Sequence, residues 1–394
     1  MLSKALVLSL FASSVAAAGV TGTPFGFAAA TTGGGNAEPV YPTTTEELTG
    51  YLTDGEARVI VLNKEFNFVG TEGETTEDGC RPDSNACPGD GGQDAINGAD
   101  WVSTILLLSY TNAHITQCTK SDYPSVSVTY DKAAITPINL GSNKSIVGEG
   151  TKGVIRGKGL RVAGAENIII QNIHITELNP QYIWGGDAIT LAGTDLVWID
   201  HVKTSLIGRQ HIVAGYDPSK RVTISNTEID GNTSWSASCD NRHYWALLLI
   251  GSGDKITFQG NYIHHTSGRS PKVGGTDEGT LLHAVNNYFY DNTGHAFSIA
   301  PEENGRVLAE GNVFESVVKP IEDGVDFLYA ATDDGAACSS PLGRTCQVNQ
   351  LTDSGDFGGS ATDFLSGYAD EGVEAEAASG VAASVKSNAG VGKL

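Results

Sequence analysis

The chain has 394 residues, 46 of them acidic and 24 basic, which gives a formal net charge of −22. This acidity disfavours a nucleic-acid partner and electrostatic docking on a membrane, because phosphate-bearing surfaces attract basic proteins. With 40% hydrophobic and 18% charged residues, the chain is neither disordered nor a helix-rich bundle, and its 49 glycines favour strands and turns.

Residues 1–18 predict a secretory signal peptide. Lys4 precedes an apolar run that ends in small residues at Ala18, where we expect cleavage. The run is too short for a comfortable membrane span, and no stop-transfer pattern follows it. We therefore expect a secreted, extracellular protein whose remaining residues, 19–394, form a single domain with no membrane partner.

The next elements resemble a cap on a larger structure. Residues 40–52 predict a helix capped by threonines, and residues 57–68 predict a strand. At the other end, from about residue 355, the chain is rich in Ala, Ser and Gly and predicts a tail that lies along the main body.

A strand-length pattern repeats between residues 168 and 314: two alternating apolar residues, a small polar residue or glycine, then a further apolar residue. Successive repeats begin 29, 25, 34, 26 and 25 residues apart. This period is too short for a βαβ unit and predicts the turns of an all-β, single-stranded parallel β-helix. The bend positions require left-handed backbone or a stacked amide ladder, and we assign their asparagines structural roles. The repeats are Ile168/Ile170/Asn172/Ile175, Val197/Ile199/His201/Thr204, Val222/Ile224/Asn226/Ile229, Ile256/Phe258/Gly260/Ile263, Leu282/Ala284/Asn286/Phe289 and Val307/Ala309/Gly311/Phe314.

Export would permit disulfides among the six cysteines, whose number leaves many connectivities open. No pair of CxxC motifs is present, which disfavours structural zinc. Asn143 and Asn232 lie in glycan acceptor motifs and would carry sugars only if exposed, although Asn143 falls in a strand-like stretch that burial could exclude.

Three stretches place charged groups where the repeat predicts apolar residues or loops, namely 182–190, 198–211 and 265–272. Stacked turns lie about 4.8 Å apart, so Asp187, Arg209 and Arg269, expected on three neighbouring turns, could reach one sugar. A surface ion-pair network around Asp187 is an equally reasonable interpretation. Trp184, Trp245 and Trp101 offer flat faces for sugar stacking, or they fill core volume.

The motifs WGGDAIT, WIDHV followed by GRQH, GNYIHHTSGRSPK, LLHAVNNYFYD and LAEGNVF together resemble fungal pectin lyases, members of the pectate lyase superfamily of right-handed parallel β-helices. The resemblance runs from about Gly19 to the tail and is densest over residues 141–316. It implies a monomeric enzyme that cleaves methyl-esterified pectin by β-elimination. Calcium-dependent pectate lyases share the WIDH strand, but here Arg209 and an apolar residue near Val213 occupy positions expected of calcium ligands, so we expect no metal or other cofactor.

The resemblance also implies roles for individual residues. Arg269 would accept the C5 proton, Arg209 and Lys272 would polarise the ester carbonyl, and Asp187 would orient the arginines. The role of Arg269 is demanding because a guanidinium normally stays protonated; neighbouring positive charges and desolvation would favour its neutral form. The substrate would further contact the aromatic residues Trp184, Trp245, Trp101 and Tyr182.

The resemblance implies three disulfides: Cys80–Cys118, Cys87–Cys239 and Cys338–Cys346. The chain departs from the family at residues 102–117, an apolar segment between Trp101 and Cys118 that we interpret as a retained intron, with a genuine loop insertion as the alternative. It also lacks tryptophan after Cys80 and has Leu248 where an aromatic residue is expected, which leaves fewer stacking platforms.

Two further functions compete with this interpretation. A polygalacturonase needs an acidic pair at one site, whereas the candidate stretches combine Asp187 with arginines. A non-catalytic β-helix that only binds polysaccharide would have no need of Arg269 opposite Asp187 and Arg209. The histidines at 201, 264 and 265 lie in or beside the strand repeats, which favours structural roles.

Overall fold

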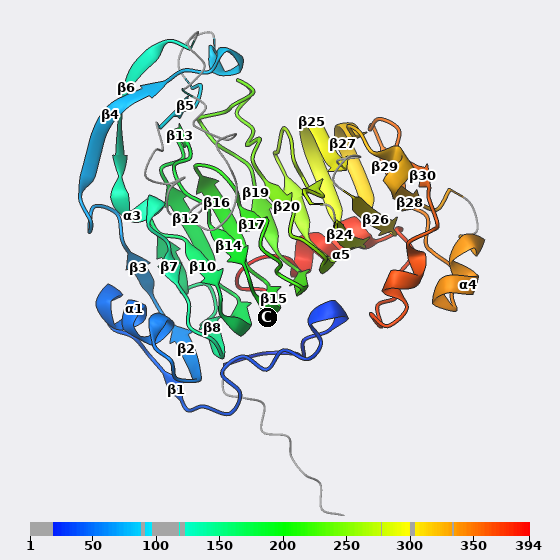
Figure 1. Ribbon diagram of the computed structural model, residues 1–394, viewed down its shortest axis with the longest axis horizontal. Helices are drawn as coiled ribbons and strands as arrows, with labels where there is room; N and C mark the ends of the chain where they lie inside the picture. The colour runs from blue at the N-terminus through cyan, green and yellow to red at the C-terminus, as the bar shows by residue number, and fades with distance from the viewer. Residues whose placement is uncertain are drawn as a thin grey trace, which may run out of the picture.

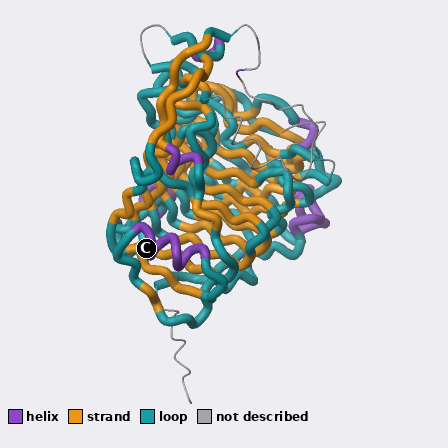
Figure 2. The backbone as a smooth tube through the Cα atoms, turned by 60° about the vertical axis from the view of Figure 1, so that its left-hand side comes forward, coloured by secondary structure: helices purple, strands orange, loops and turns teal. Residues whose placement is uncertain are grey.

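The computed structural model describes residues 19–87, 91–96, 118, 123–276, 278–299, 304–332 and 335–394. These residues form a right-handed, single-stranded parallel β-helix, in which each complete turn contributes one short strand to each of three faces (Figure 1). Figure 2 shows the strands of successive turns stacked side by side, with the helices at the margins. The predicted fold class is confirmed.

The first face is an 11-stranded sheet that is parallel except at its last pair. Its strands, in spatial order, are β1 (Pro39–Val40), β2 (Arg58–Leu62), β8 (Lys144–Gly148), β11 (Glu166–Gln171), β15 (Asp195–Asp200), β18 (Arg221–Ser225), β21 (Asp254–Gln259), β24 (Thr280–Val285), β26 (Gly305–Glu310), β28 (Leu328–Ala330) and β30 (Gly359–Ser360).

The second and third faces are joined into one 15-stranded sheet by the long strand β25 (Tyr288–Ile299), which contributes to both. The other strands of the second face are β3 (Glu65–Asn67), β9 (Val154–Arg156), β12 (His174–Leu178), β16 (Lys203–Ile207), β19 (Glu228–Asp230), β22 (Tyr262–His264), β27 (Val313–Ile321) and β29 (Gln350–Thr352). The other strands of the third face are β7 (Ile138–Asn139), β10 (Leu160–Ala163), β14 (Ile189–Ala192), β17 (Ile212–Ala214), β20 (Leu247–Leu249) and β23 (Lys272–Val273).

A separate four-stranded sheet rises from one end of the solenoid (Figure 1). It consists of β13 (Tyr182–Ile183), β5 (Asp94–Ala95), β4 (Glu74–Cys80) and β6 (Ser125–Asp131). The helices are short: α1 (Thr45–Thr53), α3 (Lys132–Ile135), α4 (Ser339–Leu342), α5 (Val381–Asn388), η1 (Gly26–Ala28), η2 (Asp83–Asn85), η5 (Val325–Phe327), η6 (Ala336–Cys338) and η7 (Leu365–Tyr368).

The predicted repeat has the observed register. Ile168 aligns with Val197, Val197 with Val222, and the alignment continues through the remaining first-face strands to Val307. All six first residues of the repeats are fully buried in one continuous core. Inward-facing residues on each turn therefore bury apolar area only because the neighbouring turns cover them.

The bends of the repeat confirm the left-handed backbone predicted for them. Asn172, His201, Asn226 and Asn286 all have φ between 45° and 57°, and the remaining two bend positions are glycines, Gly260 and Gly311. The amide ladder lies one residue further along. The side chains of Asn261, Asn287, Asn312 and Asn349 are hydrogen-bonded in series at 2.9 Å.

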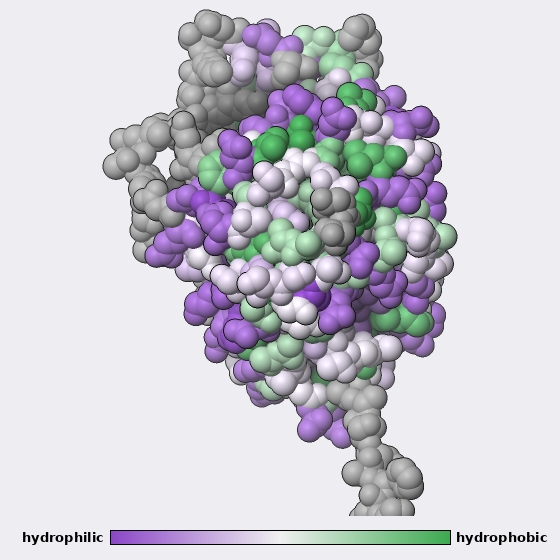
Figure 3. Space-filling model, turned by 90° about the vertical axis from the view of Figure 1, so that its right-hand side faces the viewer, coloured by the Kyte–Doolittle hydropathy of each residue, from purple (hydrophilic) through white to green (hydrophobic). Residues whose placement is uncertain are grey.

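The N-terminal helix and the C-terminal tail pack as predicted, whereas the single strand predicted over residues 57–68 is two strands, β2 and β3, on different faces. Helix α1 has Thr44 as its N-cap, whose hydroxyl accepts a hydrogen bond from Glu47 N, and it buries Leu48 and Leu52 over the first turn of the solenoid. The tail lies along the second face, where Val381 and Val385 of α5 contact Tyr288. Figure 3 shows the C-terminal end of the solenoid, where hydrophobic side chains are scattered among hydrophilic ones.

All three expected disulfides are present: Cys80–Cys118, Cys87–Cys239 and Cys338–Cys346. Asn232 and Asn143 are both exposed, and Asn143 precedes β8 instead of lying within a buried strand, because its left-handed backbone forms the bend before that strand. Its Oδ1 accepts a hydrogen bond from Asn167 Nδ2 at 2.7 Å.

Three of the sequence predictions lie outside the described residues: the signal peptide at 1–18, Trp101, and the interpretation of segment 102–117. Across the described part of the chain, the search for a helix of sufficient length and hydropathy to cross a membrane found none.

Candidate active site

The candidate catalytic residues occupy equivalent places on the turns that lead into the third face. Asp187, Arg209, Trp245 and Arg269 lie two or three residues before β14, β17, β20 and β23, respectively. These four strands are consecutive neighbours in the sheet. The expectation of three neighbouring turns is therefore wrong in one respect: the turn that carries Trp245 separates Arg209 from Arg269. Its third-face strand follows a long loop, residues 231–246, which obscured it in the sequence.

Asp187 is buried beside Arg209. Its Oδ1 accepts a hydrogen bond from the backbone N–H of Gln210 at 2.8 Å, and its Oδ2 lies 3.9 Å from Arg209 Nη1. Burial raises the pKa of Asp187, and this effect is opposed by the Arg209 charge and by the Gln210 N–H. The carboxylate is thus fixed by one backbone bond and lies beside the Arg209 guanidinium.

The Arg209 guanidinium stacks on Trp184, with 3.7 Å between its central carbon and the ring centroid. Burial lowers the pKa of Arg209 to about 10; Asp187 acts against this shift and the positive charge of Arg269 adds to it. The group consequently remains a cation at neutral pH. The electrostatic effect of Arg269 on Arg209 also shows that the two guanidiniums are near enough to repel each other.

Buried His243 holds the backbone of Arg209 in place. Its Nε2 donates to the Arg209 carbonyl oxygen at 2.5 Å. Burial lowers the pKa of His243 to about 4, so the ring is neutral and keeps this proton near neutral pH. Sequence reasoning missed this histidine, although its position two residues before Trp245 was a usable signal.

Aromatic rings and backbone hydrogen bonds hold Arg269, and none of the described carboxylates pairs with it. Its guanidinium carbon lies 4.7 Å from the Trp245 ring centroid and 5.8 Å from that of Tyr244. Its backbone, in the left-handed region at φ 43°, donates from N to His295 Nε2 at 3.1 Å and accepts from Leu247 N at 2.7 Å. Burial lowers the pKa of His295, which favours the neutral ring that can accept this bond. Sequence reasoning missed Tyr244 and His295.

Strand pairing aligns a row of outward-facing residues along the third face. Thr190 aligns with Val213, Val213 with Leu248, and Leu248 with Lys272. Val213, Leu248 and Ile250 form a small apolar cluster. The prediction of an apolar residue near Val213 is therefore met, and Lys272 lies beside that cluster on the turn that carries Arg269.

The two described tryptophans of the site pack against the four-stranded sheet. Trp184 and Trp245 contact the apolar cluster of Cys80, Ala95 and Ile183, which includes the Cys80–Cys118 disulfide. Because a guanidinium covers one face of each tryptophan, a sugar could stack only on the other face. Tyr182 accepts a hydrogen bond at its hydroxyl from Thr129 N at 3.2 Å and packs on Tyr130.

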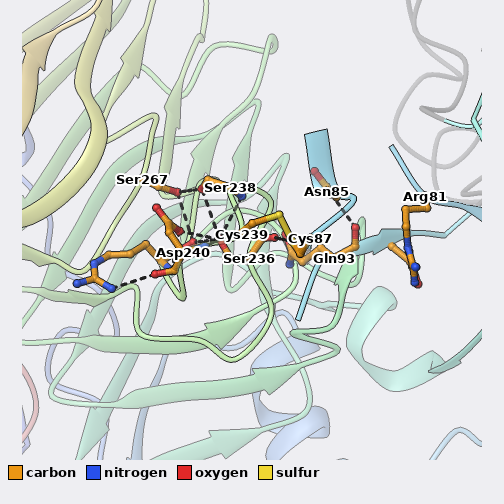
Figure 4. Close-up of a disulfide and its surroundings, with 11 residues drawn as sticks. Arg81, Asn85, Cys87, Gln93, Ser236, Ser238, Cys239, Asp240 and Ser267 are labelled. Carbon is orange, nitrogen blue, oxygen red and sulfur yellow. Dashed lines mark hydrogen bonds and ion pairs between the residues drawn. A yellow bond between two sulfur atoms is a disulfide. The ribbon is translucent and has the colours of Figure 1, made fainter. Parts of the chain in front are cut away.

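A second disulfide fixes the loop that precedes the Arg269 turn. Figure 4 shows Cys87–Cys239 joining the N-terminal segment to the loop that carries Ser236 and Ser238. Ser238 donates a hydrogen bond to Ser267, two residues before Arg269. From the N-terminal segment, Gln93 Nε2 donates to the carbonyl oxygens of Pro180 and Gly208, on the turns that carry Asp187 and Arg209.

The carboxylates that could hold a metal lie elsewhere. Among the described residues, the one group with suitable ligand spacing is Glu228, Asp230 and His264 on the second face. Lys203 Nζ already bridges this group, at 2.8 Å from Glu228 and 3.0 Å from Asp230. At the third face, Asp187 is the carboxylate that the structure pairs with a guanidinium.

The described chain thus combines a three-faced parallel β-helix with stacked arginines and a buried aspartate beside its third face. Residues 90–394 match the pectate lyase family. The chain therefore belongs to the pectate lyase family.

Within that family, its curated relatives are fungal pectin lyases. It is 54% identical to pectin lyase B of Emericella nidulans, with 98% of each chain covered, and 51% identical to pectin lyase 2 of Aspergillus oryzae, again with 98% of each covered. It is 52% identical to a probable pectin lyase F of Aspergillus niger, over 98% of this chain and 78% of the relative.

Solved structures support the fold. A Bacillus subtilis pectate lyase mutant aligns with a TM-score of 0.57 at 15% identity, covering 97% of this chain and all of that one. A pectate lyase from a Bacillus species, solved in complex with trigalacturonate, aligns with a TM-score of 0.56 at 19% identity, covering 94% of this chain and 99% of that one.

Proposed function

We propose that the chain is a secreted, monomeric pectin lyase that cleaves methyl-esterified galacturonan by β-elimination without calcium. The observation that carries this proposal is the pair of guanidiniums, Arg209 and Arg269, held on tryptophan faces beside a single buried carboxylate, Asp187. Such a site offers fixed positive charge, and among the described residues the one carboxylate group with metal-ligand spacing lies on the second face.

In the reaction, the C5–H bond breaks, its proton passes to the base, and its electron pair is delocalised onto the neighbouring ester carbonyl as an enolate. That pair then forms the C4–C5 double bond as the C4–O bond breaks, and the departing oxygen takes up a proton. Negative charge develops on the carbonyl oxygen next to C5, where a fixed cation stabilises it most. Arg209 suits this task because its pKa of about 10 keeps it charged, and Asp187 and Trp184 limit its movement.

Arg269 is the proposed proton acceptor. No carboxylate among the described residues pairs with it, and its guanidinium carbon lies 4.7 Å from the Trp245 ring centroid. Lys272 and the apolar residues Val213 and Leu248 line the same row of the third face. An uncharged methyl ester fits that apolar surface better than an ionised carboxylate does.

The test compares highly methylated pectin with unesterified polygalacturonate, each with a strong calcium chelator. We expect new ultraviolet absorbance from the unsaturated product on methylated pectin alone. Reducing ends without that absorbance would indicate hydrolysis. Activity that is greater on polygalacturonate and abolished by the chelator would indicate a calcium-dependent pectate lyase.

A further inference from the structure

Arg161 differs from most arginines of this protein because no carboxylate among the described residues forms an ion pair with it. Seven of the ten arginines form an ion pair with a carboxylate: Arg58, Arg81, Arg156, Arg209, Arg221, Arg242 and Arg344. The remaining three are Arg161, Arg269 and Arg306. In a chain with 46 acidic residues, an arginine without a carboxylate partner calls for an explanation.

The three differ in where they lie. Arg306, on the first face, stacks on Phe327 with 4.5 Å between its guanidinium carbon and the ring centroid. Arg269 belongs to the candidate active site. Arg161 lies on β10 of the third face, half-buried, and its Nε is buried without a hydrogen-bond partner. Its side chain faces outward, because its neighbours Leu160 and Val162 are in the solenoid core.

Strand pairing places Arg161 in the same outward row as the residues around the candidate site. Arg161 aligns with Thr190, and the row continues through Val213 and Leu248 to Lys272. This stretch of the row therefore has a cation at each end, with Thr190 and the apolar residues Val213 and Leu248 between them. With about 4.8 Å between neighbouring strands, Arg161 and Lys272 are separated by four steps, or roughly 19 Å.

We propose that Arg161 binds the free carboxylate of an unesterified galacturonate unit, several sugars away from the bond that is cleaved. The inference rests on the proposed function and deepens it. A guanidinium is suited to a carboxylate because it donates two parallel hydrogen bonds in a plane. The apolar middle of the row takes the esterified units, whereas the Arg161 end takes an ionised one. The preferred substrate is then pectin with a free carboxylate at a fixed distance from an esterified scissile bond.

The charge of the whole chain makes such a site selective. A formal net charge of −22 repels an ionised polymer over most of the surface, so an anionic unit gains most where a cation lacks a carboxylate of its own. Because Arg161 is half-buried, its attraction for the carboxylate is less screened than that of a fully exposed side chain.

The test uses Arg161→Gln, which removes the charge but keeps a polar side chain of similar reach, with Arg306→Gln as the matched control. The first measurement is the calorimetric Kd for unesterified oligogalacturonate, which requires no turnover. We expect Arg161→Gln to weaken binding about tenfold at low salt, with a smaller effect at high salt, and Arg306→Gln to leave it unchanged. Equal binding by Arg161→Gln and the wild type would overturn the proposal.

The second measurement is kcat/KM on two pectins of matched length, one fully methylated and one partly de-esterified. Arg161→Gln should lose about tenfold on the partly de-esterified pectin only, and Arg161→Lys should restore part of it. An equal loss on both pectins would show that Arg161 does not read a free carboxylate. A wild-type enzyme inactive on both would refute the proposed function, while the binding measurement would still decide the assignment of Arg161.

Discussion

Two charged regions of this molecule are constructed in opposite ways. Where the C-terminal segment meets the first face, buried His283 lies between Glu310 and Glu371, with contacts of 2.7 and 2.6 Å, and Arg344 makes two hydrogen bonds to Glu310. Beside the third face, no described carboxylate pairs with Arg269, and Asp187 Oδ2 lies 3.9 Å from Arg209 Nη1. The first, saturated region joins its charges in close carboxylate pairs, whereas the second holds its guanidiniums against the rings of Trp184 and Trp245.

The difference follows from what each region must do. A charge that only holds two segments together is most stable when its hydrogen bonds are complete, because an unpaired buried charge is costly. A charge that must stabilise a developing anion gains from keeping its donors available until the substrate arrives. Aromatic faces suit this purpose, because Trp184 and Trp245 position the guanidiniums without accepting their N–H donors.

The largest expected effect is on turnover, from Arg269→Lys. This change keeps the positive charge but removes the planar group that stacks on Trp245. We expect kcat on methylated pectin to fall by about 100- to 1,000-fold, the typical cost of losing one preorganised catalytic group. The measurement is the initial rate at which ultraviolet absorbance increases as the unsaturated product forms.

The control is Arg344→Lys in the saturated region, which should lower stability and leave kcat near the wild-type value. Near-normal turnover in Arg269→Lys would remove Arg269 from the role of proton acceptor.

The next effect is on stability, from Glu310→Gln. Glu310 is fully buried and bonds His283, Arg344 and the backbone N–H of Gln347. Neutralising it leaves buried His283 and half-buried Arg344 with a single carboxylate, Glu371, so we expect a loss of about 3 kcal/mol in the free energy of unfolding. Denaturant titration measures this loss. The control is Asp195→Asn, which breaks the more exposed pair with Arg221 and should cost less than about 1 kcal/mol. Similar losses in the two variants would contradict the contrast between saturated and exposed charges.

The sequence predicted the repeating strands and bends of the solenoid better than the details of the candidate site. The repeat fixed the register from Ile168 to Val307, because strand period and bend chemistry are local properties. Resemblance to the family supplied Asp187, Arg209 and Arg269 and the disulfides. Sequence could not show that Trp245 separates the two arginines, that His243 and His295 fix their backbones, or that no described carboxylate pairs with Arg161. Those facts depend on which turns are neighbours and on where each side chain ends, and neither is encoded in a short window of sequence.

The smallest effect expected is the pH dependence of stability, and it belongs to the saturated region. The two glutamates raise the pKa of buried His283 to about 9 from an ordinary value of 6.5, despite the opposing effect of burial. Its contribution to stability is therefore complete below about pH 6.5 and is lost as pH rises through 9.

Burial also raises the pKa of Asp254 to about 7 from 3.8, so the folded state loses stability as pH rises from about 4 through 7. Both groups lower the stability of the folded state as pH rises, Asp254 between about pH 4 and 7 and His283 between about pH 6.5 and 9. Unfolding midpoints measured from pH 4 to pH 9.5 should separate them: His283→Gln should flatten the decline above pH 6.5, and Asp254→Asn the decline below pH 7. A His283→Gln profile parallel to that of the wild type above pH 6.5 would show that the buried network holds His283 neutral, and the region would then not be the saturated counterpart of the active-site arginines.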